Sequence, residues 1–296
     1  MLDIHLAIPP NIARKTIDDL KKDFPGIHIR PHQTHVEMDA FFEKDFGKPE
    51  HTADLTLTAY PSALTRLVAM DDPGQVFASM PETLPALRPD LADLGVTEAN
   101  PYYRVVCLVC LVAIAHKDTN PFPQAWGDLC HENIRDAMAI PPEETPAPAL
   151  YTYFQTRLNG DAGREAARRT NKTLLPLDIN QGVDAGDFKA GMLLSAFART
   201  FRHNNARMVW PREGAFALPL LAFLKKDAPR EALDILTIIF GRSFQEFLAK
   251  DGGFVPVRAD VDVFGEVAEN HCHIQWMGWQ DYTSMKEEYH RQMGVQ

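Results

Sequence analysis

The chain has 296 residues, of which 45% are hydrophobic and 24% are charged, and its formal net charge is −10 at pH 7. This length favours two domains of ordinary size or one large domain, and the acidic balance argues against a broad nucleic-acid-binding face. No segment approaches the roughly 20 apolar residues of a membrane span, and four cysteines are too few to indicate a disulfide framework.

The N-terminal region predicts strands that alternate with helices. Residues 3–8 predict a strand that Pro9 and Pro10 end, and Asn11 is predicted to cap a helix over residues 12–24. Further strands are predicted at residues 27–30 and 53–58, and Tyr60 precedes another helical run. This alternation predicts an α/β fold with a mostly parallel sheet covered on both faces.

The middle of the chain repeats this arrangement. Residues 137–140 predict a strand that Pro141-Pro142 ends, and Thr145 is a candidate cap with Pro146 at the first helical position. Asn159-Gly160 is predicted to close that helix. The repetition indicates either two similar halves or chance, because a proline pair is common after a strand.

Two apolar runs are predicted to carry the chain between two domains, one at residues 105–115 and one at residues 217–224. The second follows a turn at Glu213-Gly214, where Gly214 can adopt a positive φ without steric cost. Asp227 is predicted to cap a helix over residues 229–240, and residues 243–246 fit a capping box for a last short helix.

A family resemblance rests on the order of several motifs. The stretch WPREGAFALPLLAFLKKDAP at residues 210–229 precedes an amphipathic helix and GGFVPVRADV at residues 252–261. Together with motifs at residues 53–55, 126–129 and 183–187, it resembles the type II periplasmic substrate-binding proteins of ABC transporters, in the branch that includes the iron-binding proteins. No single motif is specific, whereas their order over roughly residues 50–262 is.

The resemblance implies two Rossmann-like lobes with mixed or parallel sheets, joined by two crossover strands. The first lobe would comprise residues 1–112 and 208–296, and the second would comprise residues 113–207. A hinge would close the lobes on a small ligand held in the cleft, for ABC-type transport or as a soluble sensor. The resemblance implies a monomer without a cofactor, without catalysis and without membrane insertion, and its partner would be a transporter permease. We expect it in the periplasm if a leader was removed before Met1, and in the cytoplasm if Met1 is the native start.

The expected ligand contacts lie where strand ends face helix N-termini, which offer backbone N–H groups and positive dipole ends and so favour an anionic ligand. The candidates are Pro9, Pro10, Asn11, Thr58, Ala59, Tyr60, Glu144, Thr145, Ala147, Phe197 and Glu213. Each of four candidates also has a purely structural interpretation. Thr145 would cap its helix, Tyr60 would pack its loop, Phe197 would belong to the core, and Glu213 would be a solvated hinge residue.

Other classes of function depend on other residues. Thiamine-related enzymes of the same fold would use Cys107, Cys110 or His116, but no base or oxyanion arrangement surrounds them, and the two cysteines are better interpreted as buried small hydrophobes.

The clusters at residues 271–273 and at His28, His32 and His35 lack a recognised metal-ligand frame, so no metal is predicted. The iron-binding members of the family carry two adjacent tyrosines late in the second lobe, and residues 174–208 contain none, which argues against iron. We do not expect an effector domain of a transcription regulator, which would need a helix-turn-helix before the predicted first strand at residues 3–8.

Overall fold

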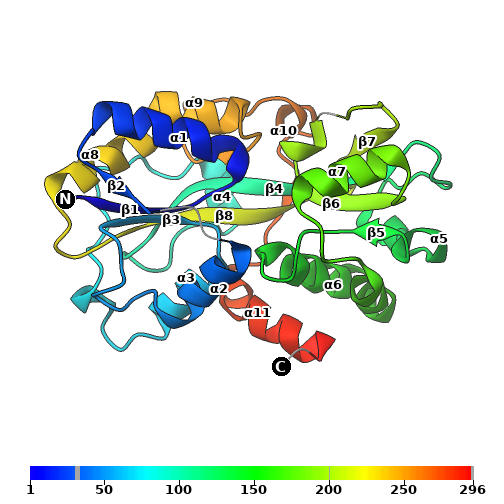
Figure 1. Cartoon of the computed structure of the whole chain (residues 1–296), viewed down its shortest axis with the longest axis horizontal. Coiled ribbons are helices and arrows are strands. Elements are labelled where there is room, and N and C mark those ends of the chain that lie inside the picture. Colours follow the sequence, from blue (N-terminus) through cyan, green and yellow to red (C-terminus); the bar gives the residue numbers. More distant parts are fainter. Residues whose placement is uncertain (31–33, 200, 295–296) are drawn as a thin grey trace. The chain divides into compact units, whose positions relative to one another are not determined.

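The computed structural model describes residues 1–30, 34–199 and 201–294 (Figure 1). The chain divides into two compact units, and each unit is assembled from three stretches of sequence. The first unit comprises Met1–Leu108, Pro219–Gly265 and Gly278–Thr283, and the second comprises Val109–Leu218, Glu266–Met277 and Ser284–Gln296. These units are defined by their internal packing. The lobes expected from the sequence are defined by their motion about a hinge, so their boundaries stay a prediction.

The elements of the first unit alternate between strand and helix near the N-terminus, as the sequence predicts. They are β1 (Asp3–Ala7), α1 (Pro10–Asp23), β2 (His28–Ile29), α2 (His35–Lys44), β3 (Leu55–Thr58), α3 (Pro61–Val68), the short helix Pro73–Gln75, α4 (Pro89–Asp93), α8 (Arg230–Ile239), α9 (Arg242–Lys250) and β9 (Val255–Pro256), with parts of β4 (Arg104–His116), β8 (Ala215–Leu224) and α11 (Trp279–Met293).

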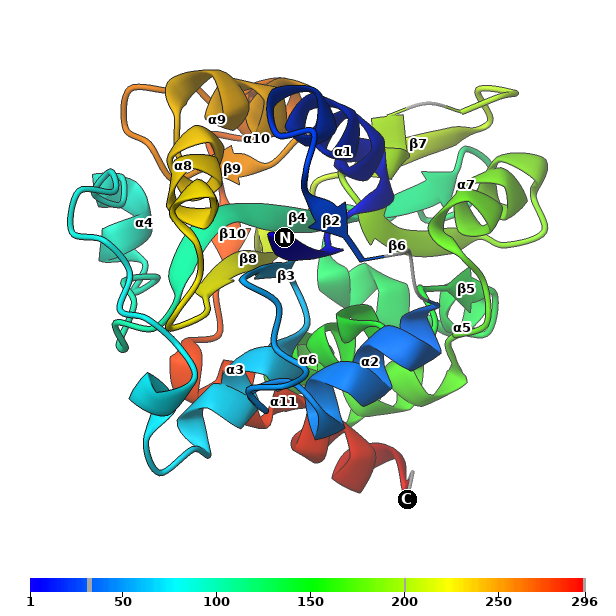
Figure 2. The same cartoon turned by 60° about the vertical axis from the view of Figure 1, so that its left-hand side comes forward.

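The sheet of the first unit has the strand order β2-β1-β3-β8. Strand β1 is parallel to β2 and to β3, with Ala7 opposite Thr58, whereas β8 is antiparallel to β3. Helices α1, α8 and α9 cover one face of this sheet, and α2 and α3 cover the other (Figures 1 and 2). Fully buried phenylalanines fill the second of these layers, where the Phe46 ring lies 5.3 Å from Phe77 and 5.1 Å from Phe223 between centroids.

The second unit contains the elements of the middle of the chain. They are the short helix Trp126–Cys130, α5 (Glu132–Arg135), β5 (Met138–Ala139), α6 (Pro146–Arg169), α7 (Pro176–Ala185), β6 (Ala190–Leu194), the short helix Phe197–Arg199, β7 (Ala206–Val209), α10 (Glu266–Glu269) and β10 (Ile274–Gln275), with the remaining parts of β4, β8 and α11.

The strands of the second unit form a mixed arrangement. Strand β5 is parallel to β6, with Ala139 opposite Gly191, and the second part of β4 is antiparallel to both β6 and β7. Helices α6 and α7 lie on opposite sides of these strands (Figure 1). Three buried aromatic rings stack in the core, with Phe216 between Trp126 at 3.8 Å and Phe154 at 4.4 Å. The structure thus confirms the predicted α/β class.

Both apolar runs form long strands, and the chain passes from one unit to the other within each of them. In β4 the passage lies between Leu108 and Val109, and in β8 it lies between Leu218 and Pro219. Every residue of β8 and all but the two terminal residues of β4 are buried. Gly214, just before β8, has a φ of 103°, which confirms the predicted positive φ.

Four predicted capping interactions are absent. Helix α1 begins at Pro10 with Pro9 as its N-cap, so Asn11 lies inside the first turn. The N-cap of α8 is Pro229, two residues after Asp227. Thr145 is the N-cap of α6, but its side chain accepts no capping hydrogen bond. Ser243 lies inside α9, whose N-cap is Gly241. The prolines explain two of these errors. Pro10, with its fixed φ, takes the first helical position of α1, and Pro229 disfavours a helical conformation at the residue before it, so that α8 begins only after Pro229.

Gly160 closes the first helical stretch of α6, as predicted. Its φ of 58° and ψ of −135° are non-helical, and a second helical stretch continues to Arg169. Helices α2, α7 and α11 were not predicted. Helix α2 nevertheless begins with a capping box, in which Thr34 accepts from the backbone N–H of Glu37 and Glu37 accepts from that of Thr34.

Candidate ligand-binding site

The carboxyl ends of β1 and β3 form a strand switch point in the first unit. The chain leaves β1 through α1 toward β2, and it returns past β1 to reach β3 on the other side. Helices α1 and α3 therefore start at the same edge of the sheet but cover opposite faces (Figure 2). In open α/β sheets a crevice forms at such a point, and ligands bind there.

The start of α1 offers few hydrogen-bond donors. Pro9 and Pro10 have no backbone N–H, and the N–H of Ile12 is bonded to the carbonyl oxygen of Pro9 at 3.1 Å. Only the N–H of Asn11 has no partner within the described part of the chain. The Asn11 side chain is directed elsewhere, since its Nδ2 approaches the carbonyl oxygen of Asp251 at 3.5 Å, and its Oδ1 is buried without a partner among the described residues.

The predicted side chains at the start of α3 are used by the protein itself. Thr58 is fully buried, and its Oγ1 accepts a hydrogen bond from the N–H of Tyr60 at 3.1 Å. The Tyr60 ring stacks on Phe42 at 5.4 Å, and its hydroxyl lies 2.8 Å from Nδ1 of His35. The carbonyl oxygen of Ala59 accepts from the Tyr282 hydroxyl at 3.4 Å. Tyr60 therefore packs its loop, and the ligand contacts of Thr58, Ala59 and Tyr60 stay predictions.

Sequence analysis missed Ser62, two residues after Tyr60. It occupies the second helical position of α3, is 6% exposed, and has neither a side-chain nor a backbone N–H partner within the described part of the chain. The signal was present in the sequence, because Ser62 follows Pro61 at the start of an apolar helix. It was interpreted only as part of the helix opening.

The second unit has a comparable edge at the carboxyl ends of the parallel strands β5 and β6. Glu144, Thr145 and Ala147 lie at the start of α6, which follows β5. The Thr145 hydroxyl donates to the carbonyl oxygen of Pro142 at 2.7 Å, so it stabilises the loop before the helix. Ala147 has a buried N–H without a partner in the described residues, and prolines precede and follow it.

Phe197 follows β6 at the same edge. It is half-buried, so the interpretation of Phe197 as a core residue is wrong. The side chain of Asn180 in α7 donates to the carbonyl oxygen of Phe197 at 2.6 Å and fixes this segment. The second unit thus brings Phe197 to the edge from which α6 starts.

Tyr289 joins the loop before α6 from far away in the sequence. Its hydroxyl donates to the carboxylate of Glu143 at 3.0 Å, and the residue is 3% exposed. Burial, reinforced by the negative charge of Glu143, raises the pKa of Tyr289, so the hydroxyl keeps its proton. Burial also lowers the pKa of Lys172, while the charge of Glu143 acts in the opposite direction. No local pattern in the sequence indicates a contact between residues 143 and 289.

Glu213 has a structural partner in the second unit. Its carboxylate accepts from the backbone N–H of Trp126 at 3.1 Å, and its carbonyl oxygen accepts from the side chain of Gln275. The Trp126 indole donates to the adjacent carbonyl of Gly214 at 2.8 Å. The interpretation of Glu213 as merely solvated is therefore wrong, and a ligand role for it stays a prediction.

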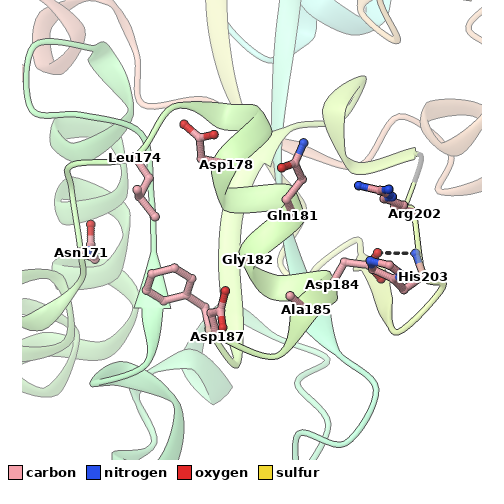
Figure 3. A pocket seen from close by; sticks show the side chains of 11 residues that line it. Asn171, Leu174, Asp178, Gln181, Gly182, Asp184, Ala185, Asp187, Arg202 and His203 are labelled. Carbon is pink, nitrogen blue, oxygen red and sulfur yellow. Dashed lines mark hydrogen bonds between the residues drawn. The ribbon is translucent and has the colours of Figure 1, made fainter.

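A groove of about 560 Å³ lies around α7 in the second unit, and none of the predicted contact residues lines it (Figure 3). Arg202 and His203 lie on one side of the helix, and Asn171 and Leu174 lie on the other (Figure 3). The carboxylate of Asp184 is fully buried in its wall and accepts the backbone N–H groups of His203, Asn205 and Ala206 at 2.5 to 3.2 Å. The Asp184 carboxylate therefore anchors the loop that carries residues 203–206.

The alternative chemistries gain no support from the geometry. Cys107 and Cys110 are fully buried in β4, and burial, followed by the charge of Cys272, raises the pKa of the Cys110 thiol, which leaves it a poor nucleophile. Among the described residues, no three histidine, cysteine or acidic side chains gather as potential metal ligands. His28 pairs instead with Asp3, and His32 lies outside the described residues. None of the described helices has the length and apolar character needed to cross a membrane.

Comparison with solved structures confirms the fold expected from the resemblance. The chain is similar to the ferric binding protein from Campylobacter jejuni, with 14% identity, a TM-score of 0.73, and coverage of 99% of this chain and 98% of the other. It is also similar to iron-bound HitA from Pseudomonas aeruginosa, with 15% identity, a TM-score of 0.73 and 99% coverage of both chains. A third similar structure is the substrate binding protein of an ABC transporter from Agrobacterium tumefaciens, with 16% identity, a TM-score of 0.71, and coverage of 99% and 95%.

Comparison of sequences identifies the family. No curated protein matches the chain significantly. Residues 53–284 match the family described as bacterial extracellular solute-binding protein, which covers most of the chain and includes the motifs from Ala53 to the GGFVPV segment. The chain therefore belongs to the family of bacterial extracellular solute-binding proteins.

Proposed function

We propose that this protein captures one small organic solute outside the cytoplasm, as a monomer, and delivers it to the permease of an ABC transporter. The observation that carries the proposal is the common construction of three helix starts. Helices α1, α3 and α6 each follow the carboxyl end of a parallel strand and have proline at the first helical position. Each then presents one N–H, from Asn11, Ser62 and Ala147, that the described chain does not use.

These groups suit an oxygen-rich solute better than a bare metal ion. Backbone N–H groups donate hydrogen bonds and do not ligate cations, and the positive ends of the helix dipoles repel them. Of the similar structures, one is a ferric binding protein and another is iron-bound HitA. In this chain we propose that the same fold serves a ligand with acceptor oxygens. Because the candidate nucleophiles Cys107 and Cys110 are buried thiols, we infer that the solute is bound without being transformed.

A thermal-unfolding screen tests the proposal. The panel comprises small carboxylates, phosphates, amino acids, polyamines, sugars and ferric citrate. A solute present at 100 times its dissociation constant stabilises the folded protein by about 2.7 kcal/mol. We expect at least one organic member to do so, and a response to ferric citrate alone would contradict the proposed ligand class.

The expected closing motion requires a separate measurement. Small-angle X-ray scattering of the protein with and without the active solute should show a smaller radius of gyration when the solute is bound. Unchanged scattering with confirmed binding would remove the hinge mechanism and leave solute capture intact.

A further inference from the structure

A histidine is buried among aromatic side chains between β1 and α2 of the first unit. His5 of β1 is 4% exposed, and its Nδ1 atom is buried without a hydrogen-bond partner among the described residues. Its ring stacks on Phe42 of α2 at 5.4 Å between centroids and lies edge-to-face with Phe41 at 4.9 Å. The imidazole therefore occupies a place in this layer that suits a nonpolar ring.

The aromatic layer connects His5 to the start of α3. Phe42 also stacks on Tyr60, the N-cap of α3, at 5.4 Å between centroids. The Tyr60 hydroxyl lies 2.8 Å from Nδ1 of His35, which is the first residue of α2. Both ends of α2 thus contribute to one set of contacts with β1 and with the start of α3.

The charged groups beside His5 do not favour a proton on its ring. Asp3 lies two residues earlier in β1, but its carboxylate is already bound by Arg30 at 2.7 Å and by His28 at 2.9 Å. Burial, followed by the positive charge of Arg30, lowers the pKa of His5 to about 4, while the charge of Asp3 acts in the opposite direction. His5 is therefore neutral at pH 7.

The other elements packed against His5 do not supply a counter-charge. The residue opposite His5 in β3 is Thr56, which is uncharged. An aromatic face attracts a cation only weakly, and Arg30 already lies 5.7 Å from the centre of the Phe41 ring. The acidic side chains of α2 and of the residue after it have contacts of their own, namely Glu37, Asp39, Glu43 and Asp45. A proton on His5 would therefore place an uncompensated charge inside this layer.

We propose that His5 is an acid-sensitive latch, which holds α2 on the sheet while the ring is neutral and releases α2 when the ring takes up a proton. Release brings the imidazole into water, which solvates the charge. Because Tyr60 stacks on Phe42, the same event loosens the start of α3. The latch is independent of the proposed function, since it requires no solute.

The difference in proton affinity sets the direction and the size of the effect. In the released state His5 would titrate near its ordinary pKa of about 6.5, whereas in the folded state it titrates at about 4. Between these values the released state binds more protons, so α2 is held less firmly as the pH falls from about 6.5 toward 4. At pH 5 the released state should be about thirtyfold more populated than at pH 7.5.

Hydrogen exchange followed by mass spectrometry at pH 7.5 and pH 5 tests the latch, with rates corrected for the intrinsic effect of pH. In the wild type, the protection of the α2 amides should fall about thirtyfold at pH 5. The protection of α8, which covers the opposite face of the sheet, should change less than about threefold. His5→Phe keeps a ring but removes the titrating group, so α2 should then behave like α8.

His35→Gln is the matched control, because His35 is the other histidine in contact with this layer and lies on α2 itself. It should keep the wild-type loss of protection. A loss in α2 that persists in His5→Phe, or that disappears in His35→Gln, overturns the proposal. An equal loss in α8 also overturns it, because His5 would then act on the whole unit.

A second measurement decides the matter if the larger ring of His5→Phe prevents folding. Nuclear magnetic resonance of the wild type follows the imidazole protons of the 11 histidines from pH 7.5 to pH 5. We expect one ring to remain neutral throughout this range. Titration of every histidine with a midpoint near the ordinary value of about 6.5 would refute the latch.

Discussion

Asp184 shows how one buried carboxylate organises a surface loop. Its two oxygens accept three backbone N–H groups from residues 203, 205 and 206 across the edge of α7. Burial alone would raise the pKa of this group, but the three N–H donors outweigh it and hold the pKa below the ordinary value of 3.8. Asp184 is therefore ionised at neutral pH and contributes to stability in that form.

Replacing this carboxylate should make the free energy of unfolding depend less on pH in the acidic range. Because the folded-state pKa is lowered, the contribution of Asp184 is present above the unfolded-state pKa and is lost as the pH falls through the folded-state pKa. At pH 7, Asp184→Asn should lower the free energy of unfolding by roughly 2–3 kcal/mol, because the N–H donors of the asparagine side chain would face the backbone N–H donors that the carboxylate now accepts. Urea titrations at decreasing pH should show this difference shrinking below about pH 4.

The neighbouring Asp187 is the matched control for this prediction. It is exposed in the turn after α7 and lines the same groove. Asp187→Asn should change the free energy of unfolding by no more than about 0.5 kcal/mol at any of these pH values. A loss in Asp184→Asn that persists undiminished at low pH would show that shape, not charge, is what Asp184 provides.

Gly214 sets the entry into strand β8 at the scale of an element. Its φ of 103° lies in the region that L side chains rarely adopt, and a Cβ there would lie 3.0 Å from the carbonyl oxygen of His273. That same carbonyl accepts the N–H of Ala215, next to the pairing of β8 with β10. The turn and the strand pairing thus depend on the absence of a side chain.

We expect Gly214→Ala to destabilise the protein by about 1–3 kcal/mol through backbone strain and crowding. The measurement is urea unfolding followed by tryptophan fluorescence. Gly26→Ala is the control, because a Cβ at that position meets no atom within 4 Å and its backbone is not strained. Equal stability of the two variants would show that the chain relaxes at this turn at little cost.

Element prediction succeeded where apolar runs are long or where proline marks a boundary. Strands β4 and β8 follow directly from continuous burial, and α3 begins at the predicted residue after Tyr60. The cap at Asn11 was wrong because the preceding Pro10 already occupies the first helical position, and the cap at Asp227 was wrong because α8 begins only after Pro229. Helix α11 was missed although Tyr282, Met285 and Tyr289 are all buried and spaced for one helical face.

Site prediction from sequence was limited by contacts between distant residues. The helix starts at Pro10, Tyr60 and Thr145 could be placed because a strand end and a proline are adjacent in the chain. That Tyr60 is already bonded to His35, or that Glu143 is bonded to Tyr289 across 146 positions, depends on the folded arrangement. The sequence therefore indicated which loops surround the site, but not which of their groups are free to meet a ligand.

At the scale of the whole molecule, the last stretch of chain completes the second unit. Residues 284–296 include Met285 and Tyr289, which are 2% and 3% exposed. A chain ending at Thr283 should lose about 4 kcal/mol or more of unfolding free energy, because two large buried side chains are removed. A chain ending at Met293 keeps α11 and should match the full-length protein in urea titrations. Full stability of the shorter chain would show that α11 is not part of this core.

The division of each unit among three stretches has a consequence for synthesis on the ribosome. The first unit begins within the first 108 residues, yet it is completed only by residues 278–283, which include the fully buried Tyr282. At bacterial elongation rates of roughly 5–20 residues per second, that delay is on the order of ten seconds or more. During this time the nascent chain exposes the strands of an unfinished core. A molecular chaperone that binds extended apolar segments would therefore find its longest target in β4, whose partners β6, β7 and β9 all emerge later.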